Sequence, residues 1–296
     1  MERRGEQRSG GWRTGQPGDR QGDSLSPDAH SHSNVSAASN RPHTAARPLS
    51  PDVHSCANVR DLGGYNTPSG LTLPHRFVRC GGTASITKTD LKAFEDWGVR
   101  RVLDLRSVGE SPRITCRFSK QPWVMWENVG LYDVDISSPT MMPATSTNNY
   151  LVSSYLHMLA TAEAIRNIFA FFAEAHEDEC VLFHCAAGMD RTGMVAMLLL
   201  GLADVPREQI IADYCYSYGP AVEVDPVVEA YCATGGFASS HRKGDFFRYL
   251  LRTRLEAIAN VYDALVQTHG SVRAYLQSCD VSSEHIDATF AHLVEE

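Results

Sequence analysis

The chain has 296 residues, of which 43% are hydrophobic, so it can bury a substantial core in one or two domains. Its formal net charge of −8 at pH 7 argues against a nucleic-acid partner, because contact with a phosphate backbone requires a basic surface. This charge does not exclude a phosphate substrate, because the local field of a binding loop decides that interaction.

Residues 1–50 differ in composition from the rest of the chain. They are rich in Ser, Gly, Arg, Pro, Asn and His, contain few large aliphatic residues and show no periodicity. Such a segment cannot bury enough apolar surface to offset its ordering entropy, so we expect a disordered tail. Its excess of arginine is also compatible with contact to an acidic surface, and an overlong gene start would look the same. We predict one folded domain over residues 51–296.

The sequence shows no signal for export or membrane insertion. No charged-then-apolar segment opens the chain, and the apolar run at residues 194–203 is too short to cross a bilayer. We therefore expect a cytoplasmic protein. The eight cysteines contain no Cys-x-x-Cys pair and no zinc spacing, so we expect reduced thiols and no metal site.

The first half of the folded region alternates strand and helix patterns. Residues 58–65 combine polar and charged side chains with a double glycine, which predicts a tight turn. Strand patterns cover residues 76–80, 101–107 and 123–129, and a helix pattern that ends at Gly98 covers residues 88–97. This succession predicts an α/β fold with a central, mainly parallel sheet flanked by helices.

The second half is mostly helical in pattern. Residues 130–149 form a long connection that holds Asp133 and Asp135, and loops of this length are often lids. Helix patterns cover residues 150–160, 162–175, 206–216 and 245–269, and a last helix follows Ser282 and Ser283. Residues 218–245 are interrupted by Gly and Pro, which predicts a helical lid or cover rather than a second core.

Residues 181–200 carry the most informative pattern in the chain. A β-prone run ends in His184 and Cys185, a short Ala/Gly turn follows, and a second apolar run begins at Arg191. The pattern predicts a buried strand, a tight loop and a helix. A buried cysteine at a strand end is commonly an inert small hydrophobe, but the glycine in this loop and the Thr-Gly after it favour a functional loop.

The spacing from Cys185 to Arg191 suits phosphate chemistry. The N-terminus of a helix favours a thiolate nucleophile, and small loop residues allow consecutive N–H groups to surround an oxyanion. Arg191 can bind two phosphate oxygens at once, and the hydroxyl of Thr192 can hydrogen-bond the sulfur. We predict phosphoester hydrolysis through a cysteinyl-phosphate. The candidate phosphate-binding residues are Ala186, Ala187, Gly188, Met189, Asp190 and Arg191.

Residues 184–193 resemble the signature of cysteine-dependent protein tyrosine phosphatases, in particular the prokaryotic tyrosine/lipid phosphatase branch. The loop of that branch usually runs His-Cys-x-Ala-Gly-Lys-Asp-Arg-Thr-Gly. Met189 stands in place of the usual lysine, which removes a cation from the mouth of the pocket and argues against phosphoinositide activity. His184 is expected to orient the loop and help to ionise the cysteine rather than act as a general base. The resemblance runs from about Val53 to the C-terminus.

The resemblance also implies roles for two earlier motifs. An Asn-x-Arg-Asp-x-Gly-Gly motif opens the domain of the resembled family, and its residues Arg60 and Asp61 either tie this segment to the core or contact substrate. Asp104 and Arg106 belong to an Asp-Leu-Arg-Ser motif that is followed by Glu110. They either line the site or form a buried ion pair beneath it.

Hydrolysis in two steps needs a proton donor for the leaving oxygen and then a base for water. The resemblance implies Asp190 for both roles, and Asp104 is the second candidate. Many eukaryotic relatives supply the acid from a Trp-Pro-Asp loop, which this chain lacks. Asp133 and Asp135 either substitute for it or are ordinary solvated loop residues. Asp213, in a helix motif that also matches the family, is expected to be structural.

We therefore predict a metal-independent protein-tyrosine-phosphatase that needs no cofactor and acts on phosphotyrosine in proteins. Dual-specificity or phosphoinositide phosphatase activity is the alternative within the same class. Two hypotheses come from other classes: a catalytically silent phosphate-binding module, and a rhodanese-like or arsenate-reducing thiol enzyme. The second of these usually needs a resolving cysteine, for which the sequence offers no good candidate. The oligomeric state is not determined by the sequence.

Overall fold

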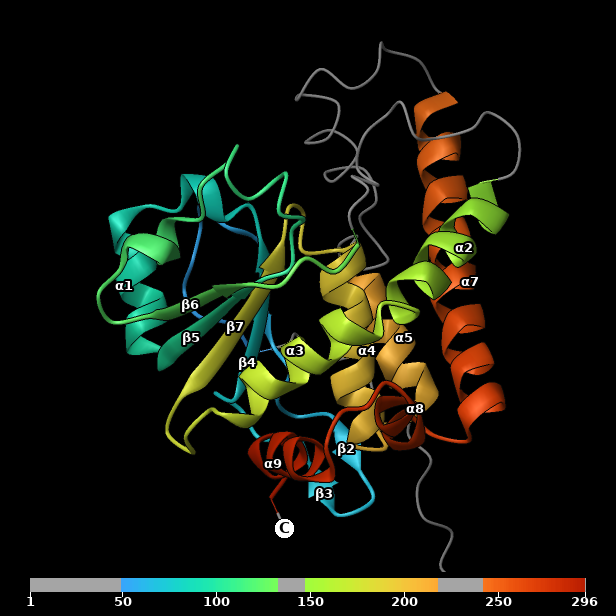
Figure 1. Ribbon diagram of the computed structural model, residues 1–296. Coiled ribbons are helices and arrows are strands. Elements are labelled where there is room, and N and C mark those ends of the chain that lie inside the picture. The colour runs from blue at the N-terminus through green and yellow to red at the C-terminus, as the bar shows by residue number, and fades with distance from the viewer. Residues whose placement is uncertain (1–48, 133–146, 218–241, 296) are drawn as a thin grey trace, which may run out of the picture. The chain divides into compact units, whose positions relative to one another are not determined.

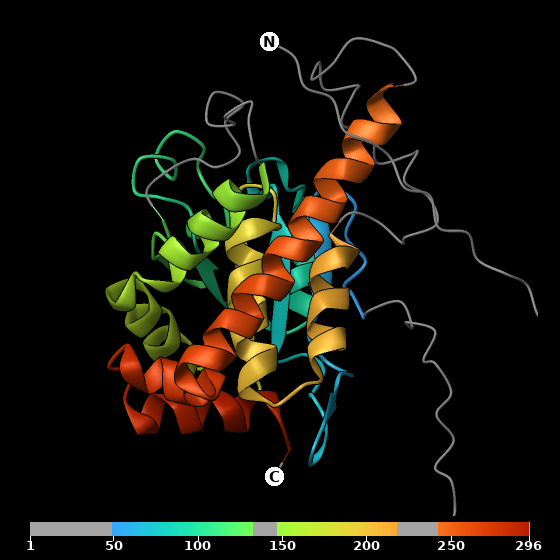
Figure 2. The same cartoon turned by 90° about the vertical axis from the view of Figure 1, so that its right-hand side faces the viewer.

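The computed structural model describes residues 49–132, 147–217 and 242–295 (Figures 1 and 2). Asp133, Asp135, nearly all of the predicted tail and most of the predicted cover lie outside the described residues. The end of the predicted cover, residues 242–245, instead begins the long helix α7 (Arg242–His269). Among the described helices, none is both long and apolar enough to span a bilayer.

Five strands form the central sheet, in the spatial order β1-β4-β7-β5-β6. They are β1 (Ala57–Asp61), β4 (Phe77–Gly81), β5 (Val99–Asp104), β6 (Met125–Asn128) and β7 (Cys180–Cys185). The last four are parallel to one another, and the edge strand β1 is antiparallel to β4. A small hairpin of β2 (Asn66–Thr67) and β3 (Gly70–Leu71) follows β1. The predicted mainly parallel sheet is confirmed.

Helices cover both faces of the sheet (Figure 1). Helix α1 (Lys88–Asp96) and the short 3-10 helices η1 (Thr83–Ser85) and η2 (Arg117–Lys120) lie on one side. The other described helices, besides α7, are α2 (Thr147–Leu159), α3 (Ala162–Ala173), α4 (Asp190–Leu202), α5 (Arg207–Tyr216), α8 (Val272–Ser278) and α9 (Ser283–Leu293). Helix α4 is buried along its whole length, as its apolar sequence requires, and Figure 2 shows α7 lying across α4 and α5. These bounds agree with the predicted helices to within a few residues.

Strand β7 divides the hydrophobic core into two parts. Val181 and Phe183 belong to the larger core with α3 and α4, whereas Leu182 packs in the smaller core beneath α1. Side chains alternate across a strand, so His184 lies on the α1 side and Cys185 on the α4 side. These two neighbours therefore meet different surroundings.

The segment 58–65 is a strand in its first half, which corrects the predicted tight turn. Strand β1 ends at Asp61, and the turn follows at Gly63 and Gly64, where Gly64 has a φ of +88°. The charged side chains of Arg60 and Asp61 are completely buried. Hydrophobic alternation did not reveal this strand, because its buried positions carry charges that partners elsewhere in the chain satisfy.

Acid is expected to destabilise the fold through His292 in α9. Its ring packs edge-on against Phe77 at a centroid distance of 5.2 Å, and burial together with the charge of Arg76 lowers the pKa of His292 to about 4. The unfolded chain binds this proton near pH 6.5, so the stabilisation by the neutral ring is complete above that pH and is lost as pH falls toward 4. When the pH is lowered from 7 to 4.5, the free energy of unfolding of His292→Gln, measured with urea, should fall by about 2 kcal/mol less than that of wild type. If the free energies of unfolding of wild type and His292→Gln changed equally with pH, His292 would not be the source of the acid sensitivity.

Candidate active site

The loop at residues 186–189 joins the end of β7 to the start of α4. Because β7 lies between β4 and β5, the loop sits at the carboxyl edge of three parallel strands. Open α/β sheets hold their active sites at this edge. The predicted strand, loop and helix are confirmed, with Cys185 and Arg191 on either side of the loop.

Two glycines bring the loop against the end of β4. Gly188 has a φ of +69°, and a Cβ at this position would lie 2.6 Å from the backbone of β4. A Cβ on Gly81 would lie 2.2 Å from the carbonyl carbon of Ala187. The N–H of Gly82 donates to the carbonyl oxygen of Ala186 at 2.8 Å. The backbone of β4 therefore fixes the path of the loop, and neither glycine can be replaced without a shift.

The loop leaves a row of backbone donors without acceptors. Among the described residues, no acceptor is found for the N–H groups of Ala186, Ala187, Gly188 and Met189. Ala186 and Ala187 are exposed, while Cys185 is only 3% exposed at the base of the loop. Together with the N-terminus of α4, these donors form a cradle for an anion beside the sulfur.

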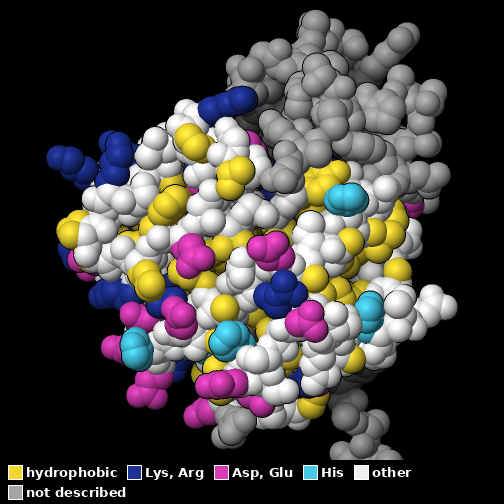
Figure 3. All heavy atoms as spheres, viewed as in Figure 1, with side chains coloured by type: hydrophobic (Ala, Val, Ile, Leu, Met, Phe, Trp, Pro, Cys, Tyr) yellow, Lys and Arg dark blue, Asp and Glu magenta, His cyan; other side chains and the backbone are white. Residues whose placement is uncertain are grey.

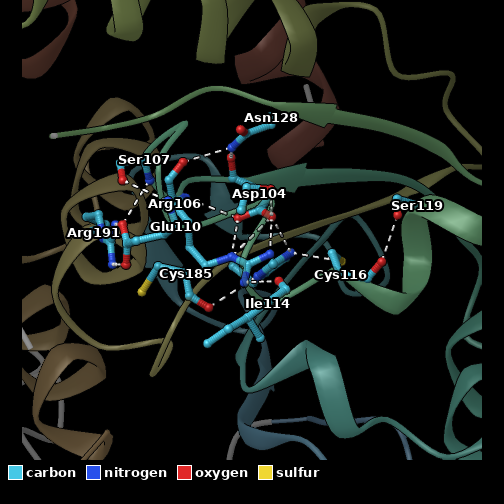
Figure 4. A network of polar contacts seen from close by, with 12 residues as sticks. Asp104, Arg106, Ser107, Glu110, Ile114, Cys116, Ser119, Asn128, Cys185 and Arg191 are labelled. Carbon is cyan, nitrogen blue, oxygen red and sulfur yellow. Dashed lines mark hydrogen bonds and ion pairs between the residues drawn. The ribbon is translucent and has the colours of Figure 1, made fainter. Parts of the chain in front are cut away.

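Glu110 holds the guanidinium of Arg191 in place (Figure 4). Its carboxylate accepts from Nη1 of Arg191 at 2.5 Å and from Nη2 at 3.0 Å. Burial opposes the charge of Glu110, but Arg191 and the N–H of Ser107 outweigh it and lower the pKa of Glu110 to about 2. Glu110 is a site residue that our list of candidates from the sequence omitted, although its position after the Asp-Leu-Arg-Ser motif was visible.

Asp104 and Arg106 form a buried ion pair beneath the site, which decides between the two predicted roles. Arg106 donates to Asp104 Oδ1 from Nε at 2.9 Å and to Oδ2 from Nη2 at 2.6 Å. Its Nη1 also donates to the carbonyl oxygen of Ile114 at 2.6 Å. Figure 4 shows the pair close to Ser107 and Glu110, which follow it in the chain. Because Asp104 is completely buried and occupied by Arg106, its carboxylate is poorly placed to act as a general acid.

A second buried cluster supports the loop from the side of α5. Asp213 pairs with Arg60 at 2.7 Å and with Arg79, and Arg79 donates to the carbonyl oxygen of Gly188 at 3.0 Å. Burial lowers the pKa of Arg79 to about 10, so it remains charged at neutral pH. Two arginines against one carboxylate leave positive charge beneath the anion cradle. Arg60 and Asp213 are therefore structural supports of the loop, and Arg79 is one that the sequence analysis missed.

Asp61 lies away from the loop. It pairs with Val78 near the start of β4, at the opposite end of that strand from Gly81. Its carboxylate accepts from the N–H of Gly63 at 2.6 Å and from Nε1 of Trp97 at 3.2 Å. Asp61 therefore ties the first turn of the domain to the end of α1.

His184 is fully buried behind the loop and linked to Cys185 through the backbone. Its Nδ1 lies 3.2 Å from the carbonyl oxygen of Cys185, so Nδ1 carries a hydrogen and donates. Its Nε2 lies 3.3 Å from Sγ of Cys116 and 3.9 Å from Oδ2 of Asp104. Burial disfavours the imidazolium, but Cys116 and Asp104 outweigh it and raise the pKa of His184 to about 9. The predicted role of His184 in orienting the loop fits these contacts.

The side chains of Asp104, Cys116 and His184 place one potential metal ligand each within 4.8 Å of one another. Arg106 donates to both carboxylate oxygens of Asp104, and its positive charge would oppose a cation there. Burial alone would raise the pKa of the Cys116 thiol, but His184 lowers it below its ordinary value. We therefore interpret the group as an electrostatic network behind Cys185. Cys116 gave no signal in the sequence, because its partner is 68 positions away.

Asp190, at the start of α4, is anchored through one oxygen. Its Oδ1 accepts from the hydroxyl of Tyr155, from the hydroxyl of Tyr214 at 3.3 Å and from Nη1 of Arg254 at 2.7 Å. In the described part of the chain, its Oδ2 accepts no hydrogen bond. Helices α2, α5 and α7 thus converge on this carboxylate. The sequence pattern did not identify these three anchors, because they lie on three separate helices.

Thr192 is buried in the first turn of α4, and its Oγ1 has no hydrogen-bond partner among the described residues. The predicted hydrogen bond from this hydroxyl to the sulfur of Cys185 is therefore not formed. Met189, which precedes α4, is partly buried against the larger core. It contributes its backbone to the loop and no charge.

Among the described residues, a row of N–H groups without acceptors runs from a strand-end cysteine to an arginine in the first turn of a helix, and such an arrangement can bind a phosphate group. Residues 51–295 match the model of the tyrosine phosphatase family. The chain belongs to the tyrosine phosphatase family and is an enzyme of that class.

Individual relatives agree with this family. A tyrosine-protein phosphatase of Nostoc commune is 30% identical over 218 residues, which are 71% of this chain and 71% of that protein. A putative tyrosine-protein phosphatase of Cupriavidus necator is 31% identical over 166 residues, which are 54% of this chain and 60% of that protein. A crystal structure of TpbA from P. aeruginosa matches 60% of this chain and 87% of its own at 15% identity. Its TM-score of 0.29 is too low to inform the site.

Proposed function

We propose that this enzyme hydrolyses phosphotyrosine in proteins through a cysteinyl-phosphate on Cys185. One observation carries the proposal: Cys185 lies at the base of a loop of unpaired N–H donors, opposite an Arg191 that Glu110 holds in place. The cradle binds the three non-bridging phosphate oxygens, and Arg191 supplies the planar fork that stabilises the transferring phosphoryl group. The names of both relatives, as tyrosine-protein phosphatases, support the choice of substrate.

In the first step, the Cys185 thiolate attacks phosphorus, the P–O bond to the tyrosine breaks, and the phenolic oxygen takes a proton from Asp190. In the second step, water attacks the cysteinyl-phosphate, Asp190 accepts the proton of that water, and the S–P bond breaks. The products are inorganic phosphate and the regenerated thiolate. The hydroxyl of Thr192, which has no partner in the described chain, is available to the departing sulfur.

The anchoring of Asp190 suits this pair of roles. Three donors fix Oδ1, so the carboxyl group cannot rotate freely, and Oδ2 is left to carry the proton. A fixed acid within reach of the leaving oxygen contributes about 10²- to 10⁴-fold to the rate. We therefore prefer Asp190 over Asp104, whose carboxylate is occupied by Arg106.

The substrate class is tested by steady-state kinetics of the wild-type enzyme in chelator and reductant. We expect turnover of p-nitrophenyl phosphate and of a phosphotyrosine peptide, with kcat/KM for the peptide about 10²-fold above that for a phosphoinositide, because Met189 adds no cation for a second phosphate. Comparable values for peptide and lipid would overturn the preference for protein substrates. If the folded wild-type protein hydrolysed none of these substrates, the chain would instead be a phosphate-binding module.

A further inference from the structure

A groove of about 630 Å³ lies between α1 and the segment that leads from η2 to β6. Four cations line it, Lys88, Lys92, Arg117 and Lys120, and Glu95 is the only acidic side chain among its lining residues. We call this feature the basic groove. In Figure 3, dark blue side chains lie on the left of the view, where Figure 1 places α1, and magenta side chains lie there as well.

The composition of the chain makes this clustering unusual. The whole sequence holds only four lysines, at positions 88, 92, 120 and 243, and three of them line the basic groove. The chain as a whole carries a net charge of −8, so its lysines gather against the overall charge. A local positive field of this kind attracts anions, whatever the sign of the total charge.

Two of the three lysines in the basic groove form no ion pair with the described residues. Lys92 pairs with Asp96 at 2.5 Å and with Glu95 at 3.3 Å, and Arg117 donates to the carbonyl oxygen of Ile86. Lys88 and Lys120 are exposed and form no ion pair or hydrogen bond with any described residue. Their charges are therefore available to a ligand.

Two walls of the basic groove are joined through the chain to segments that contact the active site. Ala84, in its wall, follows closely after Gly82, whose N–H donates to the loop carbonyl of Ala186 at 2.8 Å. Thr115, also in the wall, follows Ile114, whose carbonyl oxygen accepts from Arg106 at 2.6 Å. Both walls thus begin in segments that touch the active-site machinery. The groove wall at Ala84 is therefore only two residues along the chain from a residue that contacts the loop.

We propose that the basic groove binds aspartate or glutamate side chains that flank the phosphotyrosine of a protein substrate. This inference rests on the proposed phosphotyrosine phosphatase function and narrows its substrate class to acidic phosphoproteins. The groove is a hollow with cations on its walls and the side chains of Leu91 and Trp123 in its lining. An extended peptide can enter such a hollow, whereas the headgroups of a flat membrane would meet mainly its rim. Ion pairs between exposed groove cations and acidic substrate side chains raise the association rate and the specificity more than they raise the affinity.

The test compares two phosphotyrosine peptides that differ only in having Asp and Glu, or Asn and Gln, around the phosphotyrosine. The double variant Lys88→Gln, Lys120→Gln removes the two unpaired cations. Arg166→Gln, Arg273→Gln removes two charges from α3 and α8 and serves as the matched control. In wild type and control, kcat/KM for the acidic peptide should exceed that for the neutral peptide about fivefold at low salt, and this ratio should fall as salt is added. In the lysine variant the ratio should approach one, with turnover of p-nitrophenyl phosphate unchanged.

Each outcome separates this proposal from the function on which it rests. Equal kcat/KM for the two peptides in wild type, or a preference that survives in Lys88→Gln, Lys120→Gln, would overturn the docking role while leaving the phosphatase intact. Loss of binding to phosphatidylserine vesicles in the lysine variant, without any peptide preference in wild type, would assign the groove to a membrane surface instead. Failure of wild type to hydrolyse p-nitrophenyl phosphate and both peptides would overturn the proposed function itself.

Discussion

Replacement of Cys185 by serine is expected to lower kcat for p-nitrophenyl phosphate by roughly 10⁴-fold or more, the scale seen when an enzyme loses its nucleophile. A serine hydroxyl is far less acidic than a thiol, so the N–H cradle and the helix N-terminus cannot generate a comparable nucleophile from it. The change removes no backbone donor and leaves the contact between Arg191 and Glu110 in place. Binding of inorganic phosphate, measured by calorimetry, should therefore persist in Cys185→Ser.

A second thiol provides the control for this experiment. Cys215 in α5 is half-buried, and Cys215→Ser should retain wild-type turnover within about twofold because serine is close to cysteine in size and Cys215 makes none of the contacts described above for the loop. Rapid quenching of wild type during turnover, followed by mass spectrometry, should detect phosphate on the peptide that contains Cys185. Substantial activity in Cys185→Ser, or a phosphorylated residue elsewhere, would refute the cysteinyl-phosphate mechanism.

Asp190→Asn should slow turnover of a phosphotyrosine peptide by roughly 10²- to 10³-fold, because the phenolic oxygen then leaves without its proton. An ester of a strongly acidic phenol, whose oxygen leaves without help, should be slowed far less in the first step. Asparagine keeps the size of the side chain and an oxygen that can still accept from Tyr155 and Arg254. The ratio of the two rates therefore reports on proton transfer rather than on packing.

The anchors of Asp190 separate a catalytic role from a structural one. If Asp190 served only to join α2, α5 and α7, then Tyr155→Phe would reproduce the effect of Asp190→Asn and would slow both esters equally. If Asp190 is the acid, its Oδ2 can still carry a proton in Tyr155→Phe. The ratio of the turnover rates of the two esters should then stay near the wild-type ratio in Tyr155→Phe and change only in Asp190→Asn. Equal slowing of both esters by Asp190→Asn would remove Asp190 from the role of general acid.

Local sequence was sufficient to predict the central features of the fold. The strand patterns at 76–80, 101–107 and 123–129 and the β-prone run from residue 181 predicted strands, and the β-α-β order predicted that they are parallel. The loop was predictable for the same reason, because Cys185, Gly188 and Arg191 are close in sequence and their geometry follows from one strand-to-helix turn. Strand β1 was missed because the pattern that marks a strand is hydrophobic, and its buried residue Arg60 is charged.

The supports of the loop could not be predicted in the same way. Glu110 meets Arg191 across 81 positions, and Arg254 meets Asp190 across 64. Such pairs depend on which strands become neighbours and on how helices cross, and neither is encoded in a short window of sequence. Arg79 itself could have been noticed, because it lies within the predicted strand at 76–80 and a buried arginine needs a partner.

The sequence by itself determined the placement of the candidate catalytic pair, a cysteine and an arginine held by one short loop between a strand and a helix. Local propensity and covalent connectivity are enough to specify such a turn. Only the tertiary structure decided that Asp104 pairs with Arg106 beneath the site, that Asp190 is held through Oδ1, and that three lysines share one groove. These arrangements arise when packing of the core brings distant segments together and buried charges must find partners.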